Sequence, residues 1–100
     1  MKTVLVSIKF EYEGTIMNHA FLVENQFIPT VNNKVQNHPI ELNGDPIELL
    51  ARFSGAKGTV LKSFELQING ITGYKLSDIE FKTNGLEIKV PIPYSNFNLK

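Results

Sequence analysis

Two histidines, His19 and His38, are the residues best suited to chemistry in this chain, because imidazole binds metals and transfers protons near neutral pH. Neither has a partner at metal-ligand spacing, and the chain contains no Cys. A serine hydrolase could be assembled from Ser54, one histidine and Asp45 or Asp78, but no Gly-x-Ser-x-Gly motif surrounds that serine. The sequence therefore predicts no catalytic residue, no metal and no cofactor, and a small hydrolase ranks third among the possible functions.

Acidic side chains two residues apart suggest a second kind of chemistry, since glycoside hydrolases use a pair of carboxylates. Glu11 with Glu13 and Asp78 with Glu80 have this spacing, which places both members of a pair on one face of a strand. Acids that alternate with apolar residues are more typical of a strand face in contact with water. We expect these acids to be solvated, and we predict that the protein is not an enzyme.

The glycine-containing segment 54–59 has some features of a phosphate-binding loop. It lacks the Gly-x-x-x-x-Gly-Lys pattern of a Walker motif, and the pattern around it predicts strands rather than a helix. Ten basic and ten acidic residues give a net charge of zero, which argues against a nucleic-acid partner. We predict a connection between strands that exposes Lys57 to a protein partner.

Three aromatic residues late in the chain are candidate contacts for such a partner, because exposed aromatic rings often anchor interfaces. Tyr74 follows the turn sequence Asn69-Gly70 and is expected near a loop. Tyr94 and Phe97 lie in the C-terminal tail. The sequence allows two arrangements of this tail. It either forms an exposed arm that binds a partner or a second copy, or it packs on the core.

A period of two in the apolar residues predicts the strands that must position these side chains. The pattern covers residues 3–12 and 60–68, and in the second segment it places Leu61 on the polar face. Residues 16–23 are nearly continuously apolar, which predicts a strand covered on both faces. Residues 25–45 are irregular and predict short edge strands and loops.

Residues 46–54 fit two structures. Asp45, Pro46 and Glu48 have the spacing of a helix start, with an acidic cap and a proline in the first turn. The apolar residues of the segment nevertheless alternate with polar ones, and a helix here would be apolar on nearly every side. We predict a strand, and a short helix near 46–54 is the alternative.

The dipeptide Asn84-Gly85 is a strong hairpin signal. A two-residue turn there would pair residues 79–83 with 86–90, and every charged pair would then be opposite in sign. The predicted pairs are Thr83–Leu86, Lys82–Glu87, Phe81–Ile88, Glu80–Lys89 and Ile79–Val90. Pro91 and Pro93 predict that this strand lies at a sheet edge or ends there.

The sequence therefore predicts one all-β domain over residues 1–100, an antiparallel, immunoglobulin-like β-sandwich of seven or eight short strands. The expected function is a non-catalytic interaction or structural module that binds a protein through loops or an edge strand. The partner could be a second copy, bound through an edge strand or the C-terminal tail. A small-ligand or carbohydrate-binding domain is the alternative.

The length of the apolar segments bears on location. None approaches the roughly 18 apolar residues of a membrane span, and the apolar run after Met1 is too short for a secretory leader. We therefore expect no membrane partner, and a cytoplasmic location if Met1 is the native start.

Overall fold

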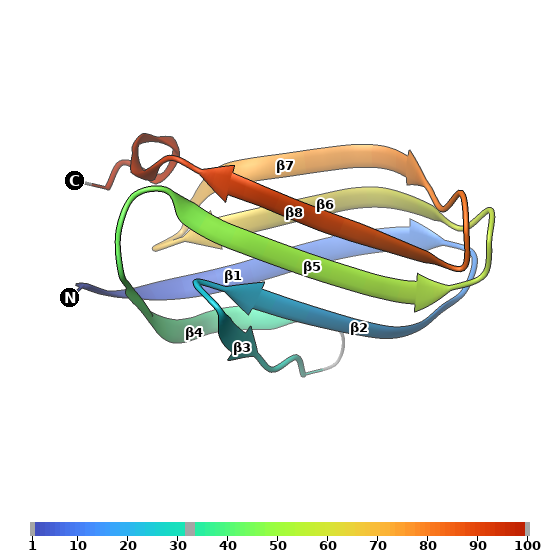
Figure 1. The fold of residues 1–100 in the computed structure, drawn as a ribbon, viewed down its shortest axis with the longest axis horizontal. Helices are drawn as coiled ribbons and strands as arrows, with labels where there is room; N and C mark the ends of the chain where they lie inside the picture. Colours follow the sequence, from blue (N-terminus) through green and yellow to red (C-terminus); the bar gives the residue numbers. More distant parts are fainter. Residues whose placement is uncertain (1, 32–33, 100) are drawn as a thin grey trace.

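Alternating apolar residues form the strands of the computed structural model, which describes residues 2–31 and 34–99 (Figure 1). The strands are β1 (Lys2–Glu13), β2 (Ile16–Val23), β3 (Gln26–Ile28), β4 (Val35–Leu42), β5 (Ile47–Gly55), β6 (Val60–Ile68), β7 (Ile71–Glu80) and β8 (Gly85–Ile92). A short 3-10 helix, η1 (Tyr94–Phe97), follows β8. The predicted all-β class is confirmed.

Two antiparallel four-stranded sheets pack face to face, which confirms the predicted β-sandwich (Figure 1). Sheet A has the strand order β4-β1-β6-β7, and sheet B has the order β3-β2-β5-β8. The chain crosses between the sheets after β1, β3, β4, β5 and β7. The sheet edges are therefore β4 and β7 in sheet A, and β3 and β8 in sheet B.

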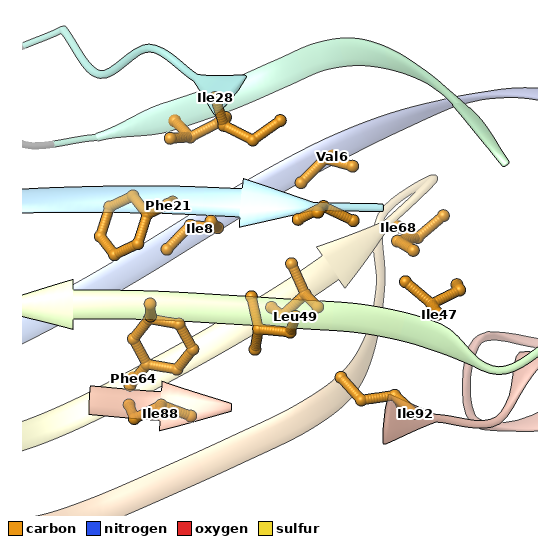
Figure 2. Packing of buried hydrophobic residues seen from close by; sticks show 14 of the residues in the cluster. Val6, Ile8, Phe21, Ile28, Ile47, Leu49, Phe64, Ile68, Ile88 and Ile92 are labelled. Atoms are coloured by element: carbon orange, nitrogen blue, oxygen red, sulfur yellow. The ribbon is translucent and has the colours of Figure 1, made fainter. Parts of the chain in front are cut away.

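Side chains from the inner faces of both sheets form the core (Figure 2). Phe21 from sheet B and Phe64 from sheet A are fully buried, with ring centroids 6.1 Å apart. Phe53 packs edge-on against Phe21 at 5.6 Å. These rings join the two layers because each spans much of the space between the sheets.

The predicted strand in segment 46–54 is confirmed as β5, which begins at Ile47, and the helix alternative is wrong. β5 lies inside sheet B between β2 and β8. Its inner face buries Ile47, Leu49, Ala51 and Phe53, while the residues between them are more exposed. Burial on one strand face outweighs the local helix-start signal, because that signal contributes only about 1 kcal/mol.

β2 differs from the prediction, since only one of its faces is buried. Met17 is 75% exposed, whereas Phe21 and Val23 are buried. A shift in the β2–β5 register between Ile16 and Asn18 indicates a bulge at Met17. The apolar run is therefore not a strand covered on both faces.

A bulge also changes the predicted faces of β6. Leu61 is fully buried, although a strict period of two places it on the polar face. The β1–β6 register shifts where Glu11 pairs with Ser63 and Tyr12 with Leu61, so Lys62 is the extra residue. The bulge turns Leu61 inward and leaves Lys62 exposed.

The predicted hairpin around Asn84-Gly85 is wrong. β7 pairs with β6 in sheet A, and β8 pairs with β5 in sheet B. Phe81 is fully buried between them, and its N–H donates to the Thr59 carbonyl at 2.7 Å. Neither Asn84 nor Gly85 is among the positive-φ residues of the described chain, although a type I′ turn needs positive φ at both positions.

The Asn69-Gly70 hairpin is confirmed. Asn69 and Gly70 have φ values of 52° and 81°, as a type I′ turn requires, and they connect β6 to β7. This turn fixes β7 on sheet A. The segment that follows it must then cross to sheet B.

The irregular region 25–45 contains more strand than predicted. β3 is short, but β4 is an eight-residue strand paired with β1. Both are edge strands, as predicted, and Pro39 lies within β4. Residues 32 and 33 of the predicted loop lie outside the described residues.

Candidate functional site

His19 is a partly buried packing residue that contacts aromatic rings of both sheets. Its ring stacks on Phe21 with centroids 5.3 Å apart and packs edge-on against Phe10 at 5.4 Å. Its Nε2 atom lies 2.9 Å from the Thr30 hydroxyl. Burial lowers the pKa of His19, which favours the neutral ring. Within residues 2–31 and 34–99, no cluster of three or more His, Cys, Asp or Glu side chains could hold a metal ion.

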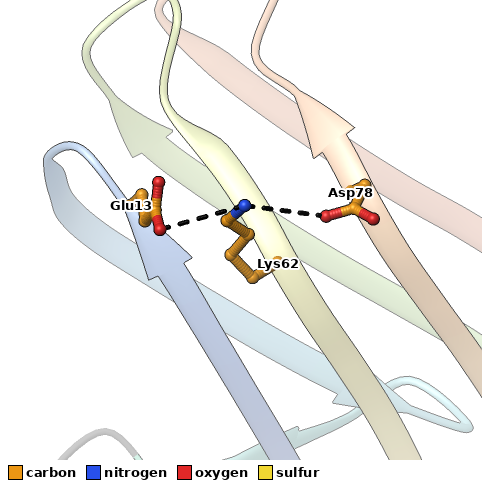
Figure 3. Close-up of polar contacts among 3 residues, drawn as sticks. All are labelled: Glu13, Lys62 and Asp78. Carbon is orange, nitrogen blue, oxygen red and sulfur yellow. Dashed lines mark ion pairs between the residues drawn. The ribbon is translucent and has the colours of Figure 1, made fainter.

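Glu13 and Asp78, one acid from each of the two pairs considered for carboxylate chemistry, face a lysine instead. The Lys62 ammonium lies 3.8 Å from a Glu13 carboxylate oxygen and 3.9 Å from an Asp78 oxygen (Figure 3). Lys62 projects from β6 between β1 and β7, so the three side chains bridge neighbouring strands of sheet A. All three are well exposed, and such pairs are worth about 0–1 kcal/mol. Glu13 and Asp78 therefore share a cation on the surface.

The outer face of sheet A carries a shallow groove of about 920 Å³. Its walls come from β1, β6 and the start of β4, and they expose polar and apolar surface in nearly equal amounts. Among the lining side chains are Lys9, Glu11, Lys34, Ser63, Glu65 and Gln67. Tyr12 also lines it and is 36% exposed. The groove offers amides, charges and one accessible aromatic ring.

Glu65 in this groove already has several partners. The Thr72 hydroxyl and the Gln67 amide both donate to its Oε1 atom, the amide at 3.1 Å. These two hydrogen bonds, with smaller contributions from nearby lysines, lower the pKa of Glu65. The carboxylate is therefore held ionised and oriented by its neighbours, an arrangement that does not suit a general acid.

The predicted contact residues Lys57 and Tyr74 lie in different surroundings. Lys57 is exposed in the connection between β5 and β6, as expected. Tyr74 lies within edge strand β7 rather than in a loop, which corrects the prediction. It is half-buried, with its ring 6.4 Å from that of Phe64, and burial raises the pKa of its phenol.

The tail packs on the core and does not extend as an arm. Phe97 is 1% exposed and fills the space above Gly73 of β7, so it offers no surface to a partner in this structure. Tyr94 is half-buried, and its N–H donates to the Asp45 carboxylate at 3.0 Å. Asn96 donates to the Gly73 carbonyl at 3.1 Å. Of the two positions considered for the tail, the structure has the packed one.

The free edge of β8 is a second candidate binding site, and none of the predicted contact residues lies in this strand. In an antiparallel ladder, alternate residues bond to opposite neighbours. The Gly55 N–H donates to the Asn84 carbonyl at 3.0 Å, in register with the β5–β8 pairing. Even-numbered residues of β8 therefore bond to β5. The N–H groups of Gly85, Glu87 and Lys89 point to the open edge.

A second hydrogen bond supports this alternation from the other side of β5. The Glu24 N–H donates to the Glu48 carbonyl at 2.9 Å, so even-numbered residues of β5 bond toward β2. Odd-numbered residues of β5 then bond to β8, in agreement with the Gly55 contact. Pro91 is odd-numbered, so its missing N–H falls on the open side, where a strand tolerates proline.

The side chains along β8 alternate in the same way. Leu86, Ile88 and Val90 face the core, and the first and last of them are only partly buried. Glu87 and Lys89 point outward and are exposed. The Glu87 carboxylate lies 3.9 Å from the Arg52 guanidinium of β5. The edge thus presents outward backbone groups, with the charged side chains of Glu87 and Lys89 on the outer face and the partly buried apolar side chains of Leu86 and Val90 on the core face.

The sequence prediction that this strand lies at a sheet edge is confirmed, but the prediction paired β8 with β7 and therefore placed it in the wrong sheet. That pairing assigned Lys82 to Glu87 and Glu80 to Lys89, whereas Arg52 lies beside Glu87 and Leu50 is opposite Lys89. Pro91 carried the edge prediction, since a strand tolerates proline where the N–H would point away from the sheet, but proline does not tell which strand lies on the other side.

Comparisons with protein-family models, with curated proteins and with solved structures found no match to this chain. Across residues 2–31 and 34–99, no helix has the length and apolarity needed to cross a membrane.

Proposed function

We propose that this protein is a non-catalytic interaction module that binds a protein partner by strand addition at the free edge of β8. The observation that supports it is the row of outward backbone groups at Gly85, Glu87 and Lys89. An extended partner segment can pair with these groups, and pockets beside the strand give specificity. Leu86 and Val90 are partly exposed along this edge and supply apolar contact area.

An affinity capture with matched baits tests this proposal. Lys89→Pro removes an outward N–H and leaves the β5 ladder intact, so we expect it to lose the partners that the wild type captures. Lys57→Ala tests the loop contact instead, and Lys82→Ala is an exposed control. A partner that still binds Lys89→Pro but not Lys57→Ala would place the interface on the loop and contradict strand addition.

The sheet A groove supports a second candidate function, a binding domain for a small polar ligand or a carbohydrate. Its amides and carboxylates could bond to hydroxyl groups, and Tyr12 could stack on a sugar ring. One accessible aromatic ring is few for such a site, so this candidate ranks second. Chemical shift changes at Lys9 and Gln67 on titration with glycans would support it.

We also propose that the sandwich is immunoglobulin-like. In immunoglobulin domains, strands B and E pair in one sheet while the following strands C and F pair in the other. The pair β1–β4 in sheet A corresponds to strands B and E, and the pair β2–β5 in sheet B corresponds to strands C and F. The two folds differ on the other side of β1. This chain has two strands there, β6 and β7, whereas an immunoglobulin domain has the single strand A beside strand B. A non-enzymatic role and a cytoplasmic location stay predictions.

A further inference from the structure

We infer that the partner strand at the β8 edge is β8 of a second copy of this chain, paired antiparallel about a two-fold axis at Ile88. This inference rests on the proposed strand addition and names its partner. It requires that two identical edges match in backbone direction, in side-chain face and in charge.

The backbone groups restrict the register first. Only odd-numbered residues of β8 have outward N–H and C=O groups. Odd-numbered residues of one copy must therefore lie opposite odd-numbered residues of the other. Registers with the two-fold axis at any residue from 86 to 90 satisfy that rule. Axes at Leu86 and Val90 place Glu87 opposite Gly85 and Lys89 opposite Pro91, respectively, so they form no ion pair across the axis. The three central registers place Glu87 opposite Glu87, Glu87 opposite Lys89, or Lys89 opposite Lys89. The pairing geometry alone does not choose between them.

Charge selects the middle register. Glu87 opposite Glu87 and Lys89 opposite Lys89 each place like charges face to face, which destabilises a strand pair. Glu87 opposite Lys89 of the second copy gives two attractive pairs, because symmetry repeats the contact. Both side chains are exposed on the outer face, and the Glu87 carboxylate would then lie between the Arg52 guanidinium of its own chain, at 3.9 Å, and Lys89 of the second copy.

The apolar side chains agree with the same register. Ile88 then lies opposite Ile88 of the second copy, and Leu86 lies opposite Val90. All three face the core side of sheet B, and Leu86 and Val90 are only partly covered in the single chain. Ile88 becomes a non-hydrogen-bonded pair, in which opposing side chains approach most closely.

Pro91 also fits this register. Its outward nitrogen, which has no hydrogen, falls opposite Gly85 of the second copy. The Gly85 N–H can still donate to the Pro91 carbonyl, so one hydrogen bond is lost at each end. The central pairs between Glu87 and Lys89 keep both of theirs.

Charge reversal tests the register. We expect the wild type to be a dimer in sedimentation equilibrium, and Lys89→Glu and Glu87→Lys to weaken it at least about tenfold each, because attractive pairs become repulsive. In an equal mixture, the two acidic side chains of the first variant face the two lysines of the second across the pairing. The mixture is therefore expected to form a heterodimer of wild-type strength.

Three results would overturn the inference: a wild type that is monomeric at all accessible concentrations, single variants that dimerise like the wild type, or a mixture that fails to recover. Thermal unfolding of each variant checks that the fold is retained. A monomeric protein whose captured partner is lost on Lys89→Pro would refute the second copy but retain strand addition. A partner that persists on Lys89→Pro would refute the proposed function itself.

Discussion

Phe97 shows how the burial of one residue changes the interpretation of the tail. Its type and position suggested an aromatic anchor for a partner, yet its ring is covered by Gly73 of β7. A Cβ at position 73 would overlap the Phe97 ring, so glycine is the residue that permits this close approach. The ring therefore belongs to the core, and its removal should affect stability.

We expect Phe97→Ala to lower the free energy of unfolding by about 3–5 kcal/mol, because it leaves a cavity under η1. Urea unfolding monitored by circular dichroism measures this loss. A change below about 1 kcal/mol would show that the ring is not buried in solution.

Gly73→Ala is expected to destabilise the protein by about 1–3 kcal/mol, since the added methyl group overlaps a fully buried ring. Gly44→Ala is the matched control, because a Cβ there meets nothing within 4 Å. Equal losses in the two variants, measured by urea unfolding, would contradict the packing of η1 on β7.

Glu24 is a residue whose charge costs stability. Its Oε1 atom is buried without a hydrogen-bond partner, and burial together with the nearby Glu48 raises its pKa. A carboxyl with a raised folded pKa favours the folded state at low pH, and this contribution is lost as pH rises through the folded pKa. At neutral pH the ionised group therefore opposes folding.

We expect Glu24→Gln to increase stability by a few tenths of a kcal/mol at neutral pH, because the group is partly exposed and screened by water. The gain should shrink as pH falls below the ordinary glutamate pKa of 4.5, where the carboxyl is protonated in both states. Urea midpoints across this pH range measure it. A gain that grows toward low pH would reverse the assigned sign.

At the scale of elements, β8 shows the limit of matching neighbouring segments by charge and polarity. Its predicted pairing with residues 79–83 brought opposite charges together and apolar residues together. Its actual pairing with β5 also makes several complementary contacts. Glu87 lies beside Arg52, and Leu86 lies opposite Phe53. Cross-strand pairs differ by only about 0.2–1 kcal/mol, too little to choose between the partners.

The alternation along β8 predicts different effects of proline at adjacent positions. Val90→Pro removes an N–H that bonds to Leu49 of β5, so we expect a loss of at least about 1–3 kcal/mol. Lys89→Pro removes an outward N–H and should cost clearly less. Thermal unfolding of the two variants compares them, and equal losses would contradict the alternation.

At the scale of the whole molecule, dimerisation through β8 would couple stability to concentration. A complex that forms only from folded chains stabilises them by mass action. We expect the Tm of the wild type to rise with protein concentration and the Tm of Lys89→Glu to stay nearly constant. Scanning calorimetry over a range of concentrations measures both. A wild-type Tm that does not change with protein concentration would indicate a monomer and contradict the pairing.

The sequence by itself determined where most strands lie and which residues face inward. It did so because a side-chain period of two is a local property, recorded directly in segments such as 3–12 and 47–55. The same locality explains its error at Leu61, where the bulge at Lys62 adds one residue and reverses the faces.

Only the tertiary structure decided which strands pair and which edge remains open. Asn69-Gly70 holds β7 on β6, Phe81 is buried between the layers, and β8 must then cross to β5. The exposed row of Glu87 and Lys89, and the burial of Phe97, follow from that crossing and not from their own neighbours in sequence. Pairing depends on packing between segments distant in the chain, and the short-range signals of turn and charge are too weak to specify it.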